Sequence, residues 1–214
     1  MNLLQKIKYL KEIQNKEELN GLTAKLPENE EVCKEILKML DNTSVAVEKN
    51  QVEDSTTSLY LVLNNKILIG NMKQSFVRIQ TIAHECIHSI QNRKTLLFHF
   101  FLANAVQFYF IFSLFLCFLL KQEVVTWSIF ASFVLASLIL FCVRYLLEKD
   151  AMLRAKDLAK RYLEQQGTLT QTEIEKITEE YTKMNKIGVP LYRDCLIGKM
   201  LWKTVLLLVI VLFL

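Results

Sequence analysis

The sequence LLFHFFLANAVQFYFIFSLFLCFLL, from Leu96 to Leu120, carries no formal charge if His99 is neutral. A second apolar stretch, VVTWSIFASFVLASLILFCVRYLL, runs from Val124 to Leu147 and has only Arg144 near its end. A helix needs about 20 apolar residues to cross the hydrocarbon core of a bilayer, and both stretches are long enough. Only KQE separates them, so they predict a tight transmembrane hairpin over residues 96–147 rather than a pair of buried core helices.

The composition fits a helical protein of ordinary domain size. Among 214 residues there are only 5 Gly and 2 Pro, which predicts few turns and long helices. The net charge is +4 and no basic stripe interleaves with aromatic residues, so nucleic-acid binding is not expected. The 5 cysteines form no CxxC pair, which indicates a reducing compartment and cysteines that act as small hydrophobic residues. The N-terminus has no uninterrupted apolar core and does not resemble a secretory signal peptide.

The chain before the hairpin predicts two helices and a small β region. Amphipathic helices are expected over residues 2–20 and 27–40, within an N-terminal helical region 1–43. They either cover a small domain or attach to a membrane surface. In the segment 44–95, SVAVEK predicts a strand, QVEDSTT a polar loop, and SLYLVL and KILIG a hairpin around Asn64 and Asn65. A helix follows that starts near Ser75, a good N-cap residue.

The chain after the hairpin predicts three helices. In the segment 148–189, a helix is expected to end at Gly167, and TQTE, residues Thr170–Glu173, is a capping box that starts another. Pro190 is expected to open a C-terminal apolar helix, 190–214. Its wholly apolar end, Thr204–Leu214, is too short to cross a bilayer by itself, because an α-helix rises about 1.5 Å per residue.

The segment QTIAHECIHSIQ, Gln80–Gln91, contains two of the three histidines of the chain. Residues i and i+4 share one helix face, so His84 and His88 can hold one Zn²⁺ between their imidazoles. Glu85 is then placed to act as general base on a water at the metal. The alternative is an ordinary amphipathic helix with solvated histidines near a membrane surface. A third ligand would discriminate between the two.

The third ligand is most simply a carboxylate. Lys94 occupies the position of the third histidine in the extended motif, His99 is expected to be interfacial, and Cys33 stands alone in its helix. Glu148 follows the second apolar stretch directly, and a hairpin of two spans returns the chain to the side that it left. Glu148 therefore comes to the same membrane face as the histidines, although a charge at a helix end is also typical of an interfacial anchor.

The segments AHECIHSIQ and EKDAMLRA together resemble the paired motifs HExxH and E-x-D-A-x-x-R-A of bacterial membrane proteins described as neutral zinc metallopeptidases, which are gluzincin-like. The arrangement is also similar to that of the heat-shock-type and prenyl-protein membrane endopeptidases. The resemblance covers residues 66–162, and more weakly the capped and terminal helices. It implies a zincin-like pair of catalytic helices joined by a transmembrane hairpin in a bacterial cell membrane.

The same resemblance implies roles for individual residues. His84, His88 and Glu148 would be the zinc ligands and Glu85 the catalytic base. Asp150 would hold a ligand imidazole in the required tautomer. Arg154 would hold Asp150 or stabilise a developing oxyanion.

We therefore predict a mainly α integral membrane protein with a small β hairpin that acts as a membrane-embedded zinc-dependent peptidase. Its expected cofactor is Zn²⁺, and its expected partners are a peptide or protein substrate and the lipid bilayer. An extended substrate is expected to add to KILIG, at Ile67, Leu68 and Ile69, if that strand is an edge strand and not an internal one. The alternatives are a membrane scaffold or binding protein with a structural or degenerate zinc site, and a zinc hydrolase for a non-peptide amide.

The distribution of basic residues predicts the orientation. Lys and Arg are frequent before the first span and after the second, whereas the connection KQE has only Lys121. Cytoplasmic flanks carry the excess of Lys and Arg, so the catalytic side is expected in the cytoplasm.

Overall fold

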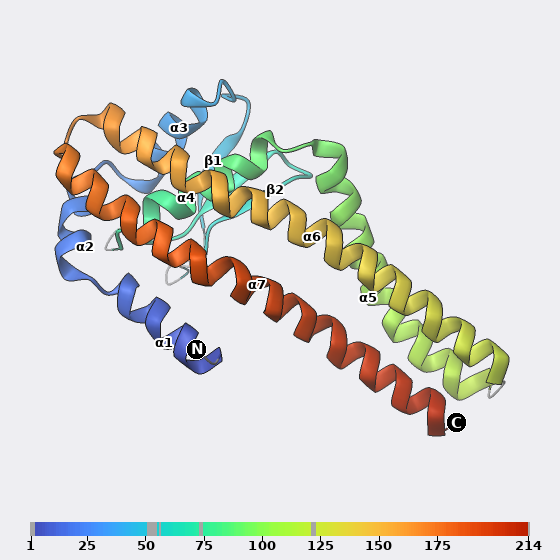
Figure 1. Cartoon of the computed structure of the whole chain (residues 1–214). Helices are drawn as coiled ribbons and strands as arrows, with labels where there is room; N and C mark the ends of the chain where they lie inside the picture. Colours follow the sequence, from blue (N-terminus) through green and yellow to red (C-terminus); the bar gives the residue numbers. More distant parts are fainter. Residues whose placement is uncertain (1–2, 51–54, 56, 73–74, 121–122, 214) are drawn as a thin grey trace. The chain divides into compact units, whose positions relative to one another are not determined.

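The computed structural model describes residues 3–50, 55, 57–72, 75–120 and 123–213, and it is mainly helical with one small sheet (Figure 1). The chain divides into two compact units. Unit 1 comprises Met1–Arg93 and Glu148–Leu191, and unit 2 comprises Lys94–Leu147 and Tyr192–Leu214. Most of the predicted polar loop QVEDSTT and the first two residues of KQE lie outside the described residues.

The N-terminal region has three helices, α1 (Leu3–Gln14), α2 (Glu17–Ala24) and α3 (Asn29–Met39). The prediction of one helix over residues 2–20 is wrong, because the structure has two helices there and the second ends beyond residue 20. Lys16 has an extended backbone and separates α1 from α2, and α2 continues through Gly21. Glycine costs a helix only about 1 kcal/mol, and the acidic first turn of α2 offsets part of that cost. The predicted second helix corresponds to α3.

The sheet contains β1 (Ala46–Lys49), β2 (Leu59–Leu61) and β3 (Lys66–Ile69) in the order β1-β3-β2. The predicted hairpin is confirmed, because β2 pairs antiparallel with β3 and Asn65 has a positive φ of 48°. β1 pairs with β3 in parallel, so β3 has neighbours on both sides. Of the two alternatives, an edge strand and an internal strand, the structure shows the internal one, so Ile67, Leu68 and Ile69 do not lie at an edge to which an extended substrate could add. The physical reason is burial: Ile67 and Ile69 lie in the core, which favours a central strand.

The helix with the two histidines, α4 (Arg78–Ile90), contacts β2 and β3 and packs against α3 (Figure 1). It begins at Arg78, three residues after the predicted start. The Arg78 side chain is fully buried, and its guanidinium donates hydrogen bonds of 2.8–3.1 Å to the carbonyls of Thr23, Leu26 and Pro27 and to Asn29 Oδ1. These bonds attach the start of α4 to the turn between α2 and α3.

The remaining helices are α5 (Arg93–Leu120), α6 (Glu123–Gln166) and α7 (Gln171–Phe213). α6 is continuous through the second apolar stretch and the segment that follows it. It ends before Gly167, whose φ is 63°, and the predicted capping box starts α7 with a bond of 2.8 Å from Thr170 N–H to Glu173 Oε2. The prediction that Pro190 opens a new helix is wrong, since α7 runs through it. Proline cannot donate the N–H of its own turn, and α7 remains helical on both sides of it.

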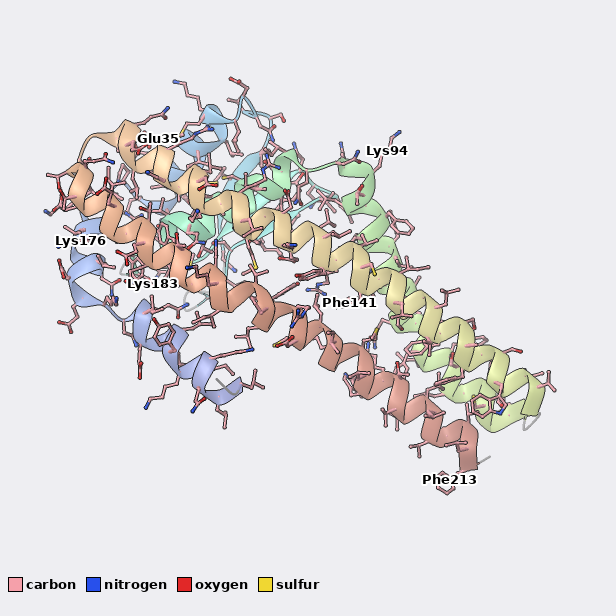
Figure 2. All side chains as sticks on the ribbon, viewed as in Figure 1. Glu35, Lys94, Phe141, Lys176, Lys183 and Phe213 are labelled. Atoms are coloured by element: carbon pink, nitrogen blue, oxygen red, sulfur yellow. The ribbon has the colours of Figure 1, made fainter. Side chains whose placement is uncertain are left out.

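Contacts within unit 1 attach α6 and α7 to the N-terminal part of the chain. Tyr162 Oη and Gln166 Nε2 on α6 each donate to Glu35 Oε2 of α3 over 2.8 Å, and Glu35 is labelled in Figure 2. Tyr181 Oη on α7 donates to the carbonyl of Phe76 over 2.7 Å, just before α4. Because these partners are far apart in sequence, they fix the tertiary position of both helices.

Three helices, α5, α6 and α7, are long and apolar enough to cross a membrane, which is compatible with a membrane protein. Within unit 2 they share an apolar core that includes Phe110, Phe133 and Leu207. Many of their large apolar side chains point outward, among them Phe108 and Val124, which are 71% and 80% exposed. Such surfaces are expected where lipid is the solvent.

Replacing Arg78 by Lys should lower the free energy of unfolding by about 2–4 kcal/mol. A single ammonium cannot satisfy four acceptors that a planar guanidinium reaches together, and a buried acceptor that loses its partner costs about 1–3 kcal/mol. Thermal unfolding in detergent, followed by circular dichroism, measures the effect. The exposed Arg161→Lys on α6 is the control, and equal melting temperatures for the two variants would contradict the role given to Arg78.

Candidate metal centre

Two imidazoles of α4 face the same side, one helical turn apart. The Nε2 atoms of His84 and His88 are 3.1 Å apart, and their rings meet edge to face at an angle of 89°. The opposite side of α4 is buried in the core of unit 1 through Ile79, Ile82 and Cys86. The spacing of the apolar residues thus directs one face of α4 into the core and leaves the face of the histidines outside it.

Glu148 of α6 completes the group. Its Oε2 lies 3.4 Å from His84 Nε2 and 3.8 Å from His88 Nε2. Zinc binds nitrogen and oxygen ligands at about 2.0–2.1 Å, so two ligands of a tetrahedral site are about 3.4 Å apart. The three observed separations surround that value, and the three residues could hold a metal ion. Two imidazoles and a carboxylate are also a donor set that zinc accepts.

Protonation in the group follows from its burial and its hydrogen bonds. Burial opposes the charge of Glu148, but the contacts with His84 and His88 outweigh it and hold the pKa of the carboxyl far below its usual range. Burial also opposes a charged His88, but the hydrogen bond with Glu148 and the charge of Glu85 raise its pKa. The carboxylate of Glu148 therefore favours a positive charge on His88. Metal binding must displace any proton from the ligand nitrogen, since histidine ligates only when it is neutral.

Glu85 lies beside this group and is not one of its members. Its side chain is 7% exposed, and its Oε2 accepts a hydrogen bond of 2.7 Å from the backbone N–H of Tyr60 in β2. Burial raises the pKa of Glu85, and the charges of His84 and His88 oppose that rise. The edge strand next to α4 thus holds one oxygen of this carboxylate in place.

A chain of polar contacts supports His88. His88 Nδ1 is 2.8 Å from Gln91 Oε1, Gln91 Nε2 donates to Asp150 Oδ2 over 2.8 Å, and Arg154 Nη1 donates to the same oxygen over 3.3 Å. Asp150 is thus connected to the His88 imidazole through Gln91. Gln91 was missed, although it lies three residues after His88 and so on the same helix face. The contact of Arg154 with Asp150 fits the first of its two expected roles.

The direction of these hydrogen bonds determines the tautomer of His88. An ionised Asp150 only accepts, so the amide nitrogen of Gln91 must face it. The amide oxygen of Gln91 then faces Nδ1 of His88, which must carry a hydrogen. In the neutral ring Nε2 is left with a free lone pair, and Nε2 is the atom nearest His84 and Glu148. This is the tautomer that a metal ligand requires.

A second set of contacts spaces the helices around the site. Asn185 of α7 accepts a hydrogen bond of 2.8 Å from Gln80 Nε2 of α4 and donates one of 2.9 Å to the carbonyl of Met152 in α6. Gln80 lies one turn before His84, and Met152 lies one turn after Glu148. One amide side chain thus connects both helices that carry ligands. No local pattern in the sequence indicated this role for Asn185.

The structure brings the residues around the HExxH motif together and leaves other candidates elsewhere. His84, Glu85, His88, Glu148, Asp150 and Arg154 all belong to unit 1. His99 lies in α5, in unit 2. Cys33 does not join the group of three, and its Sγ lies 3.6 Å from Sγ of Cys86, inside the core.

Comparisons with known proteins give no family for this chain. A scan against models of protein families, a search of curated proteins and a search of solved structures each found no match.

Changing Gln91 to Met should weaken zinc binding by about 10- to 100-fold, because His88 loses the partner that fixes its tautomer. Competition with a metal chelator measures the affinity. Gln165→Met, an exposed position in the last turn of α6, is the matched control. Equal affinities in the two variants would show that the connection from His88 to Asp150 has no effect on the metal.

Proposed function

We propose that the chain is a zinc-dependent peptidase embedded in a membrane, which hydrolyses peptide bonds of membrane or membrane-proximal proteins. One observation carries the proposal. Three donor atoms, from His84, His88 and Glu148, meet at distances that suit one metal ion, and a separate buried carboxylate, Glu85, adjoins them. Metal-assisted hydrolysis needs ligands that hold the metal and a nearby group that acts as a base, and these four residues could supply both.

The roles of the residues follow from this division. Zinc bound by the three ligands would polarise the scissile carbonyl and make water a stronger acid. Three protein ligands leave a coordination position open, as catalytic sites require. Glu85 takes a proton from water and delivers it to the leaving amine. Because the Tyr60 N–H holds Oε2, Oε1 is the oxygen that we expect to exchange the proton.

The alternative is a membrane scaffold or binding protein with a structural zinc site. A structural site is usually closed by four protein ligands. The group found among the described residues has three, which favours the peptidase. A hydrolase acting on a non-peptide amide would use the same residues, so only its products would distinguish it.

The proposed orientation places the site at the cytoplasmic face. α4 precedes the candidate span Arg93–Cys117, and Glu148 follows the apolar stretch at the beginning of the next candidate span. Two crossings return the chain to one side, which supports a shared location for the ligands. The basic residues that flank the two stretches favour the cytoplasm.

Single reporter cysteines in a cysteine-free chain test that orientation. An impermeant thiol reagent added to intact cells should label Gln122→Cys, in the connection KQE, and not Asn92→Cys or Gln165→Cys. Labelling of Asn92→Cys and Gln165→Cys alone would invert the orientation. Labelling of only one of these two would separate the histidines from Glu148 and contradict the metal site.

Two glutamate variants should lose different properties. Glu85→Gln is expected to keep about one zinc per chain and to lose about 10²–10⁴-fold in turnover, because it removes the base and spares the ligands. Glu148→Ala should lose stoichiometric zinc, because it removes a ligand. Elemental analysis measures the metal, and mass spectrometry of new protein N-termini in membrane fractions measures the cleavage.

The outcomes separate the candidate functions. New N-termini that depend on Glu85 support the peptidase. Zinc without any Glu85-dependent cleavage would favour the scaffold protein. Full zinc content and full activity in Glu148→Ala would place the third ligand elsewhere.

A further inference from the structure

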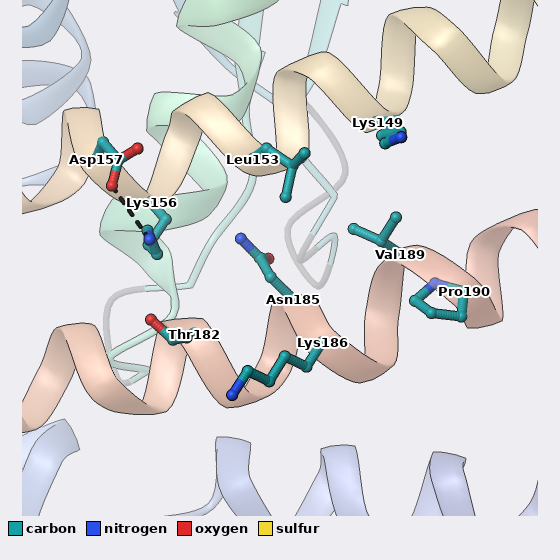
Figure 3. A pocket seen from close by; sticks show the side chains of 9 residues that line it. All are labelled: Lys149, Leu153, Lys156, Asp157, Thr182, Asn185, Lys186, Val189 and Pro190. Atoms are coloured by element: carbon teal, nitrogen blue, oxygen red, sulfur yellow. Dashed lines mark ion pairs between the residues drawn. The ribbon is translucent and has the colours of Figure 1, made fainter.

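A cavity of about 420 Å³ opens between α6 and α7 within unit 1 (Figure 3), and its lining does not include His84, His88 or Glu148. Nine residues line it: Lys149, Leu153, Lys156, Asp157, Thr182, Asn185, Lys186, Val189 and Pro190. Neither the proposed metal site nor its supporting contacts use the lysines of this cavity.

The charge of the lining is positive. Lys149 and Lys156 come from α6 and Lys186 from α7, and the single acidic residue is Asp157. Asp157 forms an ion pair with Lys156, with 3.2 Å between Nζ and Oδ1, drawn as a dashed line in Figure 3. Three lysines and one aspartate give the lining a formal charge of +2. The complementary occupant is therefore an anion, and ammonium groups commonly bind phosphate as point charges.

The rest of the lining is apolar or already hydrogen-bonded. Leu153 and Val189 face each other across the cavity in Figure 3, and Pro190 adjoins them. The Asn185 amide already accepts a hydrogen bond from Gln80 and donates one to the carbonyl of Met152. A wall that is cationic on one part and aliphatic on another fits an amphiphile better than a small soluble anion.

The sequence places these residues where lipid headgroups are found. Lys149 is the second residue after the apolar stretch Val124–Leu147 in the continuous helix α6. At 1.5 Å per residue, Lys149 to Leu153 lie about 3–9 Å beyond its end. The headgroup layer extends about 5–8 Å beyond the hydrocarbon core on each side. Basic pockets of membrane helices at this depth are typical sites for anionic headgroups.

We propose that the cavity between α6 and α7 binds an anionic phospholipid, with its headgroup phosphate beside Lys149 and Lys186 and its glycerol and upper acyl carbons against Leu153, Val189 and Pro190. The proposal does not depend on the metal. A lipid bound here would contact both α6 and α7. It would therefore stabilise the spacing between these helices, to which the hydrogen bond from Asn185 to Met152 also contributes.

Native mass spectrometry of the full chain in detergent, titrated with dioleoyl phosphatidylglycerol or dioleoyl phosphatidylcholine, tests this directly. The wild type should bind phosphatidylglycerol more tightly. Each neutralised lysine near an anionic headgroup should weaken binding about 5-fold, so Lys149→Gln combined with Lys186→Gln should weaken it about 25-fold. Lys160→Gln combined with Lys176→Gln is the matched control, since it removes one exposed lysine from each helix outside the cavity.

Unchanged thermal unfolding of the double variant shows that it folds, and unchanged binding in His84→Ala separates the lipid site from the metal. Equal loss of binding in the cavity variant and its control would overturn the proposal, as would equal affinity for the two lipids. Displacement of phosphatidylglycerol by an equal concentration of inorganic phosphate would identify a site for soluble phosphate and contradict a lipid site.

Discussion

The metal-binding group depends on the separation between α4 and α6, because α4 supplies two donor atoms and α6 the third. All three atoms lie within 4.8 Å of one another, so a shift of α6 by a fraction of a turn would break the group. Two bridges maintain that separation. One is the hydrogen bond from Gln91 to Asp150 at the end of α4, and the other is Asn185, which connects Gln80 near the start of α4 to Met152 of α6. The ligands are thus positioned by amide side chains that would not themselves touch a metal.

The rest of unit 1 supports this arrangement from the other side of α4. Arg78 attaches the first residue of α4 to the turn between α2 and α3, and β2 holds Glu85 through the N–H of Tyr60. α6 also contains an apolar stretch long enough to cross a membrane, directly before Glu148. A single helix therefore carries both the third donor and a candidate span. This continuity gives a physical reason to expect substrates that lie in or close to the membrane.

The sequence predicts best what depends on neighbouring residues. The spacing of His84 and His88, the turn at Asn65 and the capping box at Thr170 are local, and the structure contains all three features. Features set by distant contacts were not predicted. The parallel partner of β3 and the acceptors of Arg78 come from segments remote in sequence. Pro190 is typical of a first helical turn, but it lies inside α7, which continues through it.

X-ray absorption at the zinc K-edge of the purified full chain tests the central claim most directly, because it reports which atoms surround the metal. The account predicts only nitrogen and oxygen neighbours at about 2.0–2.1 Å, with the outer-shell scattering of two imidazoles. Neighbours at about 2.3 Å would indicate thiolate ligands. Cys33 and Cys86, whose sulfurs are 3.6 Å apart, would then be the candidates. That result would contradict a site formed by His84, His88 and Glu148.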